Sequence, residues 1–167
     1  MRDISGAWHI DPVTLRDVAL DPKALENALA SELALLDRVR YLALLNRESE
    51  ALREGLQALE GSPDRGELLL VLAQVFLRQY RWHEAAALQE EALQLVSTRA
   101  EEAHVRHHIG RRLFDEALYG DAAAEFEWAA DLYRVSGRHQ LAERSKQAME
   151  RCRQLRNQTR ANHPGAL

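Results

Sequence analysis

The sequence predicts an all-α protein built from antiparallel helix hairpins, with no β-sheet. Ala, Leu, Glu and Arg, which are among the strongest helix formers, dominate the 167 residues. Only four prolines and eight glycines interrupt the chain, so long helices can form. Small residues also recur: 34 residues separate Ala51 from Ala85, and 37 separate Ala85 from Ala122. β-branched residues never alternate with polar ones over the length of a strand, which leaves no pattern for a sheet.

Two Asp-Pro pairs, at 11–12 and 21–22, each indicate the start of a helix. Aspartate can accept hydrogen bonds from the free amides of a first turn, and proline fits that turn because its missing N–H has no partner there. Gly61 to Asp64 has the composition of a loop. The predicted elements of this half are helices over 12–20 and 22–45, a corner at 46–48, a helix through 60 and a loop at 61–64.

The second half shows the same alternation of helices and tight corners. Gly137 suits the end of a helix, because glycine takes the left-handed conformation without strain. The predicted elements are helices over 65–79, 85–96 and 99–118, a corner at 119–121, a helix ending before Ser136, a helix over 138–156 and a frayed tail over 157–167. No domain boundary is evident. We therefore predict one domain over 1–167, with a lead-in over 1–21, hairpins over 22–60, 65–97 and 99–136, and a capping helix over 138–156.

The small residues keep one register. Ala73 precedes Ala85 by 12 residues, and Gly110 precedes Ala122 by 12. Antiparallel helices cross closely only where side chains are small, so these pairs mark helix crossings. Each hairpin leaves an apolar face that must stack on a neighbour. The longer 37-residue step predicts about one additional helical turn around 96–103.

At these residues the sequence resembles the tetratricopeptide repeat (TPR) family. The stretch 69–95, with Tyr80 to Ala85 at its corner, is similar to one such repeat, and the resemblance extends over about 33–134. Gly55 and Gln89 stand where the family usually has an aromatic residue. The helix over 138–155 resembles the polar capping helix of the family. The resemblance implies a right-handed stack of helix hairpins, an α-solenoid, that works as a non-catalytic protein-binding module.

The resemblance also implies a binding site. In this family the first helix of each hairpin lines a concave groove that binds peptides. Carried over in register, the groove residues are Leu70, Gln74, Leu77, Arg78, His104, His107, Arg111 and Phe114. Leu36 and Arg40 of the first copy join them. Such a mixed surface suits an extended peptide with a hydrophobic anchor and an acidic or carboxylate group.

Two other functions remain open. Leucines such as Leu33, Leu36 and Leu44, which we expect to be exposed, would favour self-association into a homo-oligomer. The histidines at 104, 107 and 108 share a helix face and could bind a metal or a small molecule. No cysteine or second histidine pair accompanies them in sequence, so we expect no metal site. The chain has no phosphate-binding loop and no nucleophile elbow, and we expect neither an enzyme nor a cofactor.

Composition bears on location and partners. The single cysteine, Cys152, excludes an intramolecular disulfide and agrees with a reducing compartment. Residues 1–12 lack a signal-peptide core, and the longest apolar run, 68–73, is too short to cross a membrane. Residues 138–160 are basic, with 7 Lys/Arg against 2 Asp/Glu, but carry no interleaved aromatic residues. We therefore expect a cytoplasmic protein that binds neither membrane nor nucleic acid.

Overall fold

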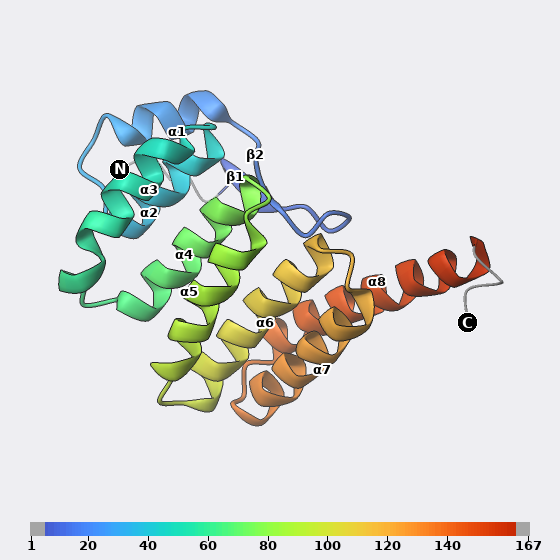
Figure 1. Ribbon diagram of the computed structural model, residues 1–167. Coiled ribbons are helices and arrows are strands. Elements are labelled where there is room, and N and C mark those ends of the chain that lie inside the picture. The colour runs from blue at the N-terminus through green and yellow to red at the C-terminus, as the bar shows by residue number, and fades with distance from the viewer. Residues whose placement is uncertain (1–5, 163–167) are drawn as a thin grey trace. The chain divides into compact units, whose positions relative to one another are not determined.

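The computed structural model describes residues 6–162, and this part of the chain is predominantly α-helical, as predicted (Figure 1). Its elements in chain order are β1 (Trp8–Ile10), β2 (Asp17–Ala19), α1 (Pro22–Leu29), α2 (Leu35–Leu44), α3 (Glu48–Ala58), the 3-10 helix η1 (Leu59–Gly61), α4 (Arg65–Arg78), α5 (Trp82–Gln94), α6 (Arg99–Asp115), α7 (Tyr119–Val135) and α8 (His139–Asn162).

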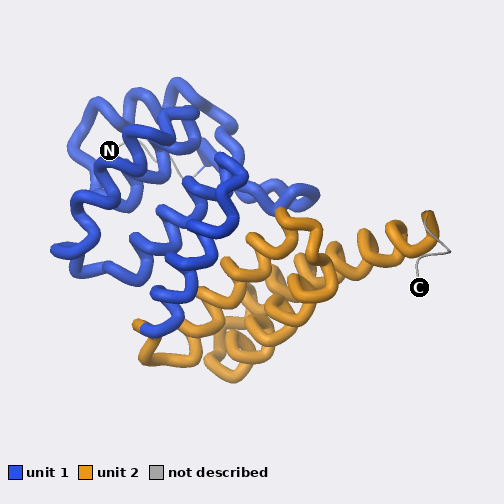
Figure 2. Tube along the Cα trace, viewed as in Figure 1, with its two compact units in different colours: residues 1–94 blue, residues 95–167 orange. Residues whose placement is uncertain are grey.

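The chain divides into two compact units between Gln94 and Leu95 (Figure 2). Unit 1 contains the strands and α1 to α5, and unit 2 contains α6 to α8. The sequence showed no boundary at this point, because Leu95 to Thr98 is short and lacks glycine and proline.

The predicted helix over 12–20 is wrong, and so is the prediction of no β-sheet. β1 and β2 form an antiparallel hairpin in which Trp8 pairs with Ala19. Asp11 does not begin a helix: its Oδ1 accepts hydrogen bonds from the amides of Val13 (2.6 Å) and Thr14 (3.1 Å) and closes a turn. These two bonds lower the pKa of Asp11. An Asp-Pro pair can start a turn as readily as a helix, and here the turn forms.

The second Asp-Pro pair begins a helix, as predicted. Asp21 Oδ1 accepts from the amide of Ala24 at 3.0 Å. The predicted continuous helix over 22–45 is wrong, however, because α1 ends at Leu29 and α2 begins at Leu35. The break lets α1 fold back on α2, so that Leu25 is fully buried in one cluster with Tyr41 and Leu44. The expectation that Leu44 is exposed is therefore wrong, because α1 covers it.

Four corners share one backbone geometry. The residue after the helix C-cap has a positive φ at Asn46 (59°), Tyr80 (57°), Ala117 (61°) and Gly137 (72°). At the first corner the amide of Asn46 donates to the Ala43 carbonyl at 3.0 Å, and that of Arg47 donates to the Leu42 carbonyl at 2.9 Å. The other three corners make the same pair of bonds, which defines the Schellman motif. Gly137 is thus confirmed as a helix-terminating residue.

The corners repeat with the predicted spacing. Asn46, Tyr80 and Ala117 lie 34 and 37 residues apart, and each precedes by five residues an alanine that is 0% exposed: Ala51, Ala85 and Ala122. The longer step comes from the start of α6, which has 17 residues where α4 has 14. The additional turn was therefore predicted in the correct place.

The helix crossings depend on the small residues. A Cβ added to Gly110 of α6 would lie 2.8 Å from Cε1 of Phe126 in α7. A Cβ added to Gly55 of α3 would lie 2.6 Å from Cδ2 of Leu72. Leu72 of α4 occupies the space beside Gly55, so the hairpin of α2 and α3 packs without an aromatic residue at that position.

The last helix continues beyond its predicted end. Asn157 to Asn162 belongs to α8, where a frayed tail was predicted, and the remaining tail residues lie outside the described part of the chain. In unit 2, α8 packs against α7 and buries Ser145, Ala148, Met149 and Cys152. Burial raises the pKa of the Cys152 thiol to about 12.

Candidate functional site

The eight main groove residues of the prediction come from two helices, each the first of its hairpin, and Leu36 and Arg40 come from a third, α2. Leu70, Gln74, Leu77 and Arg78 lie on α4 in unit 1, whereas His104, His107, Arg111 and Phe114 lie on α6 in unit 2. We describe the two sets separately, as the α4 set and the α6 set.

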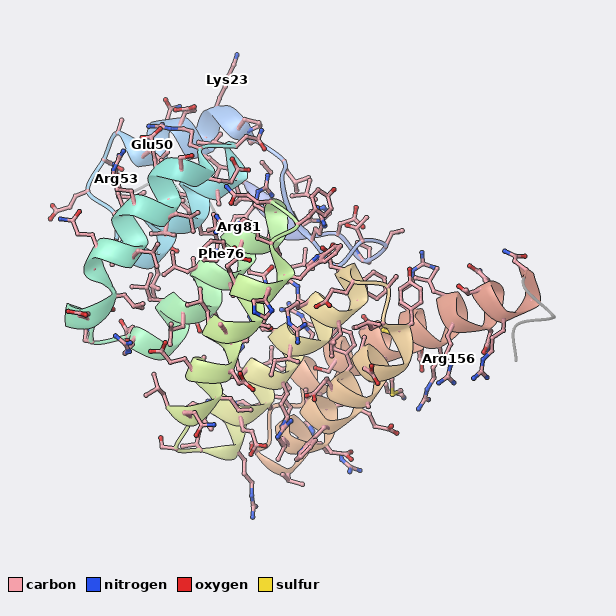
Figure 3. All side chains as sticks on the ribbon, in the orientation of Figure 1. Lys23, Glu50, Arg53, Phe76, Arg81 and Arg156 are labelled. Carbon is pink, nitrogen blue, oxygen red and sulfur yellow. The ribbon has the colours of Figure 1, made fainter. Side chains whose placement is uncertain are left out.

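Both leucines of the α4 set are buried. Leu70 is 1% exposed and Leu77 is 6% exposed, and Leu77 packs in a cluster with Ala73, Phe76 and Ala85. Arg81, which follows the corner at Tyr80, covers this cluster with its guanidinium 4.6 Å from the centre of the Phe76 ring (Figure 3). The leucines offer no apolar surface to an incoming peptide, and Gln74 and Arg78 remain partly accessible.

Arg78 connects three segments of unit 1. Its Nη1 donates to the main-chain carbonyl of Asp17 in β2 at 3.2 Å, and its Nη2 donates to Asn46 Oδ1 at 3.0 Å. Its Nε lies 3.5 Å from Glu48 Oε1. The side chain that the register assigns to a groove is therefore engaged by the β hairpin and by the corner between α2 and α3.

In unit 1 the first helices of the hairpins, α2 and α4, carry Arg40 and Arg78, and we call the surface that these two side chains form the first-helix face. The β hairpin contacts this face at a second point, besides Arg78. The guanidinium of Arg40 in α2 lies 5.2 Å from the centre of the Trp8 ring, a cation–π geometry. Arg40 also pairs with Asp37 at 3.4 Å and with Glu67 at 3.7 Å. Sequence reasoning missed Trp8 and the hairpin, because it placed a helix over 12–20.

The hairpin also reaches the corner after α4. The guanidinium of Arg16, in its loop, lies 4.6 Å from the centre of the Tyr80 ring. Tyr80 meets Trp82 edge to face at 6.2 Å. Tyr80 is 62% exposed, so this contact lies on the surface.

In the α6 set, His107 is held between helices of unit 2. Its Nδ1 lies 2.8 Å from the Ser145 hydroxyl in α8, and its ring meets Phe126 of α7 edge to face at 5.1 Å. Desolvation lowers the pKa of His107 to about 3, and the positive charge of Arg111 adds to the effect. Desolvation is the larger of these two causes. At pH 6 His107 is therefore neutral, and it cannot report an acidic partner by titrating between pH 6 and 8.

The other members of the α6 set are packed to different extents. Arg111 is 5% exposed and Phe114 is 8% exposed, and Phe114 contacts Tyr119 at 5.4 Å between ring centres. The register places Arg111 in a groove, but its side chain is buried and offers little surface to a partner. His104 is partly exposed, and its Nδ1 lies 3.3 Å from the Tyr133 hydroxyl. His104 and His107 are thus the partly exposed members of this set, and Arg111 and Phe114 are its buried ones.

Unit 2 carries two surface features that the sequence did not single out. Trp128 is 51% exposed, and the guanidinium of Arg106 lies 3.3 Å from the centre of its indole. An open cleft of about 290 Å³ lies between the corner after α6 and the distal part of α8, where Arg156 and Arg160 line it. The sequence did not indicate this cleft, because the last helix was predicted to end at 156, before Thr159 and Arg160.

The structure adds two findings on metal and membrane. Among residues 6–162, no three His, Cys, Asp or Glu side chains come together in a way that could hold a metal ion. His104 and His108 nevertheless stack edge to face, at 4.8 Å. No helix in the described part of the chain has the length and apolar character needed to cross a membrane.

No protein-family model matches this chain, nor does any curated protein or solved structure.

Proposed function

We propose that the chain is a non-catalytic, TPR-like module in which each unit binds an extended segment of a partner protein through its own first helices, α2 and α4 in unit 1 and α6 in unit 2. The repeated corner carries this proposal. All three helices end in the same Schellman geometry, at spacings of 34 and 37 residues. Each corner is followed, five residues later, by a fully buried alanine. Repeated hairpins of this kind form extended faces from equivalent helices, and such faces bind proteins.

Packing inside each unit supports the repeat interpretation. In unit 1, α4 packs against both α2 and α3, as the first helix of a following hairpin would. In unit 2, α8 packs against α7 and reaches α6 through the bond between His107 and Ser145. α8 thus takes the place of the next first helix, which is the role of a capping helix.

Burial narrows the proposed contact residues. Leu70, Leu77 and Phe114 are enclosed, so their apolar contribution is to the core. Among the partly exposed polar side chains of the two sets, we propose Gln74 and His104 as contact residues. Both side chains can donate and accept hydrogen bonds, so they would bind the main-chain amides and carbonyls of a peptide segment. We propose the cytoplasm as the location, since the free, buried thiol of Cys152 suits a reducing compartment.

The test compares matched glutamine variants. The full chain and its Gln74→Ala and Gln57→Ala variants are used as baits for affinity capture from the native cell, with quantitative mass spectrometry of the captured proteins. Gln57 lies exposed on α3, a second helix. A partner of the first-helix face should bind Gln74→Ala about five- to tenfold more weakly, the loss expected for one hydrogen bond, and should bind Gln57→Ala normally. Equal capture by all three proteins would contradict the proposal, as would an equal loss with both variants.

A further inference from the structure

We infer that the β1–β2 hairpin is a built-in occupant of the first-helix face of unit 1, and that a partner binds there by displacing it. The partner would be an extended peptide segment whose uncharged aromatic side chain replaces Trp8 over Arg40 and whose main-chain carbonyl replaces that of Asp17 at Arg78. This inference rests on the proposed function, and it specifies that the bound segment carries an uncharged aromatic side chain.

The hairpin engages the face at the residues that the repeat register assigns to the groove. Arg40 of α2 and Arg78 of α4 belong to that set, and both contact the hairpin. One contact is to an aromatic ring, and the other is to a main-chain carbonyl of an extended strand. Both are contacts that a peptide from another protein could supply.

The charges around the two arginines favour an aromatic group over an acidic one. Asp37 and Glu67 already neutralise Arg40, and Glu48 lies beside Arg78. A carboxylate brought to this face would meet resident carboxylates as well as the arginines. The guanidinium of Arg40 is instead available as a planar surface for stacking, which Trp8 now uses. This differs from the acidic or carboxylate partner that the sequence suggested.

Releasing the β1–β2 hairpin from the helices requires little free energy. Each strand has three residues and no third strand joins them in the described chain, and an isolated two-stranded hairpin is at best marginally stable. Between residues 6 and 21 only Ala7 and Leu15 are buried. Val13 and Leu20 face solvent, at 57% and 56% exposure, whereas Trp8 and Ala19 are partly buried against the cluster of Leu25, Tyr41 and Leu44. Local opening of such a segment requires much less free energy than unfolding the helices.

The test uses the full chain and a labelled synthetic peptide with the sequence of residues 6–21. The Trp8→Ala variant weakens the resident hairpin, and Trp128→Ala, which removes a half-exposed tryptophan from unit 2, is the matched control. Hydrogen exchange reports release of the hairpin through the amides of Leu20 and Asp21, which donate to the Ala7 carbonyl at 2.8 and 3.0 Å. Fluorescence anisotropy reports peptide binding.

The Trp8→Ala chain should exchange the amides of Leu20 and Asp21 at least tenfold faster, with no change in α4. It should bind the peptide at least tenfold more tightly than do the natural chain and Trp128→Ala. A peptide with alanine in place of Trp8 should bind it at least tenfold more weakly. Replacing Trp8 by Glu in the peptide should weaken binding to a similar extent, because the site prefers an uncharged ring.

Several results would overturn the inference. The peptide could bind the natural and Trp8→Ala chains equally, or fail to bind after the hairpin has been released, or bind best with glutamate at the position of Trp8. If Trp8→Ala unfolds, Arg16→Ala serves instead, because it removes the contact with the Tyr80 ring and leaves Trp8 in place; a hairpin that stays closed in that variant would refute displacement. The peptide assay contains no cellular partner, so failure of the capture experiment and failure of this one are separate results.

Discussion

Replacing Gly110 by alanine tests the close crossing of α6 and α7. In the middle of an exposed helix this change would stabilise the fold by about 0.5–1 kcal/mol, because alanine restricts the unfolded chain and favours the helix. Here the new methyl carbon would lie 2.8, 2.9 and 3.0 Å from three carbons of the Phe126 ring. Carbon atoms in ordinary contact are about 3.5–4.0 Å apart, so the ring or the helix must move by about 0.5–1 Å.

The ring has little room to move. Phe126 is 0% exposed, and His107 already meets it edge to face at 5.1 Å. Overpacking of a closed core costs about 1–3 kcal/mol. After the gain in helix propensity is subtracted, we expect Gly110→Ala to lower the free energy of unfolding by about 1–2 kcal/mol. Urea unfolding followed by circular dichroism at 222 nm measures this difference.

The matched control is Gly120→Ala, in the first turn of α7. A Cβ at Gly120 meets no atom within 4 Å, so this change should be neutral or stabilising by up to about 0.5 kcal/mol. A double-mutant cycle with Phe126→Leu should show favourable coupling of about 1 kcal/mol, because the smaller side chain accommodates the methyl group. If Gly110→Ala stabilises as Gly120→Ala does, or if the two changes in the cycle are additive, the crossing is not close.

Four further outcomes are expected. The folded-state pKa of His107, about 3, lies below the unfolded value of about 6.5, so its contribution to stability is present above pH 6.5 and is lost as the pH falls. Urea unfolding should show that the free energy of unfolding is lower by about 2 kcal/mol at pH 5 than above pH 6.5, and His107→Gln should largely remove this difference. The raised pKa of Cys152 should make its alkylation at pH 8 at least a hundredfold slower in the folded protein than in urea, as measured by mass spectrometry; equal rates would show that the thiol is not buried. Arg111→Ala should lower the free energy of unfolding by about 1–3 kcal/mol, whereas Arg99→Ala, at an exposed position, should change it by less than about 0.5 kcal/mol; matching losses would place Arg111 on the surface. Ala117→Gly should stabilise the protein by about 0.5–1 kcal/mol in thermal unfolding, because its φ of 61° suits glycine, and a lower Tm would contradict this.

The helices and their corners were predictable because local chemistry determines them. The buried Ala85 and Ala122 mark crossings that depend on side-chain size, and size is evident in the sequence. The start of α1 was predictable for the same reason, since Asp21 caps its own helix. The hairpin was not, because Asp11 and Pro12 fit a turn as well as a helix, and only the packing of Ala7 and Trp8 against α1 and α2 decides between them.

The groove residues show where prediction from sequence stops. The register assigned Arg78 and Arg111 to one surface, since both are polar and lie on first helices. Whether such a side chain faces solvent depends on what covers it. The main-chain carbonyl of Asp17, 61 residues away in sequence, accepts a hydrogen bond from Arg78. Arg111 is buried, at 5% exposure. A repeat pattern specifies the position of a residue on its helix, but long-range contacts determine its accessibility.

The corners also determine where the chain can change length. At each of the four corners the positive-φ residue precedes an alanine by five residues: Ala51, Ala85, Ala122 and Ala142. One residue inserted in that interval would turn the following helix by about 100° and move its alanine off the crossing. The connections before α4 and α6 carry no such constraint, and the three additional residues of the longer repeat entered at the start of α6. Loop insertions and fused tags are therefore best accommodated at 61–64 and 95–98, because a change of length there does not rotate the alanines away from the helix crossings.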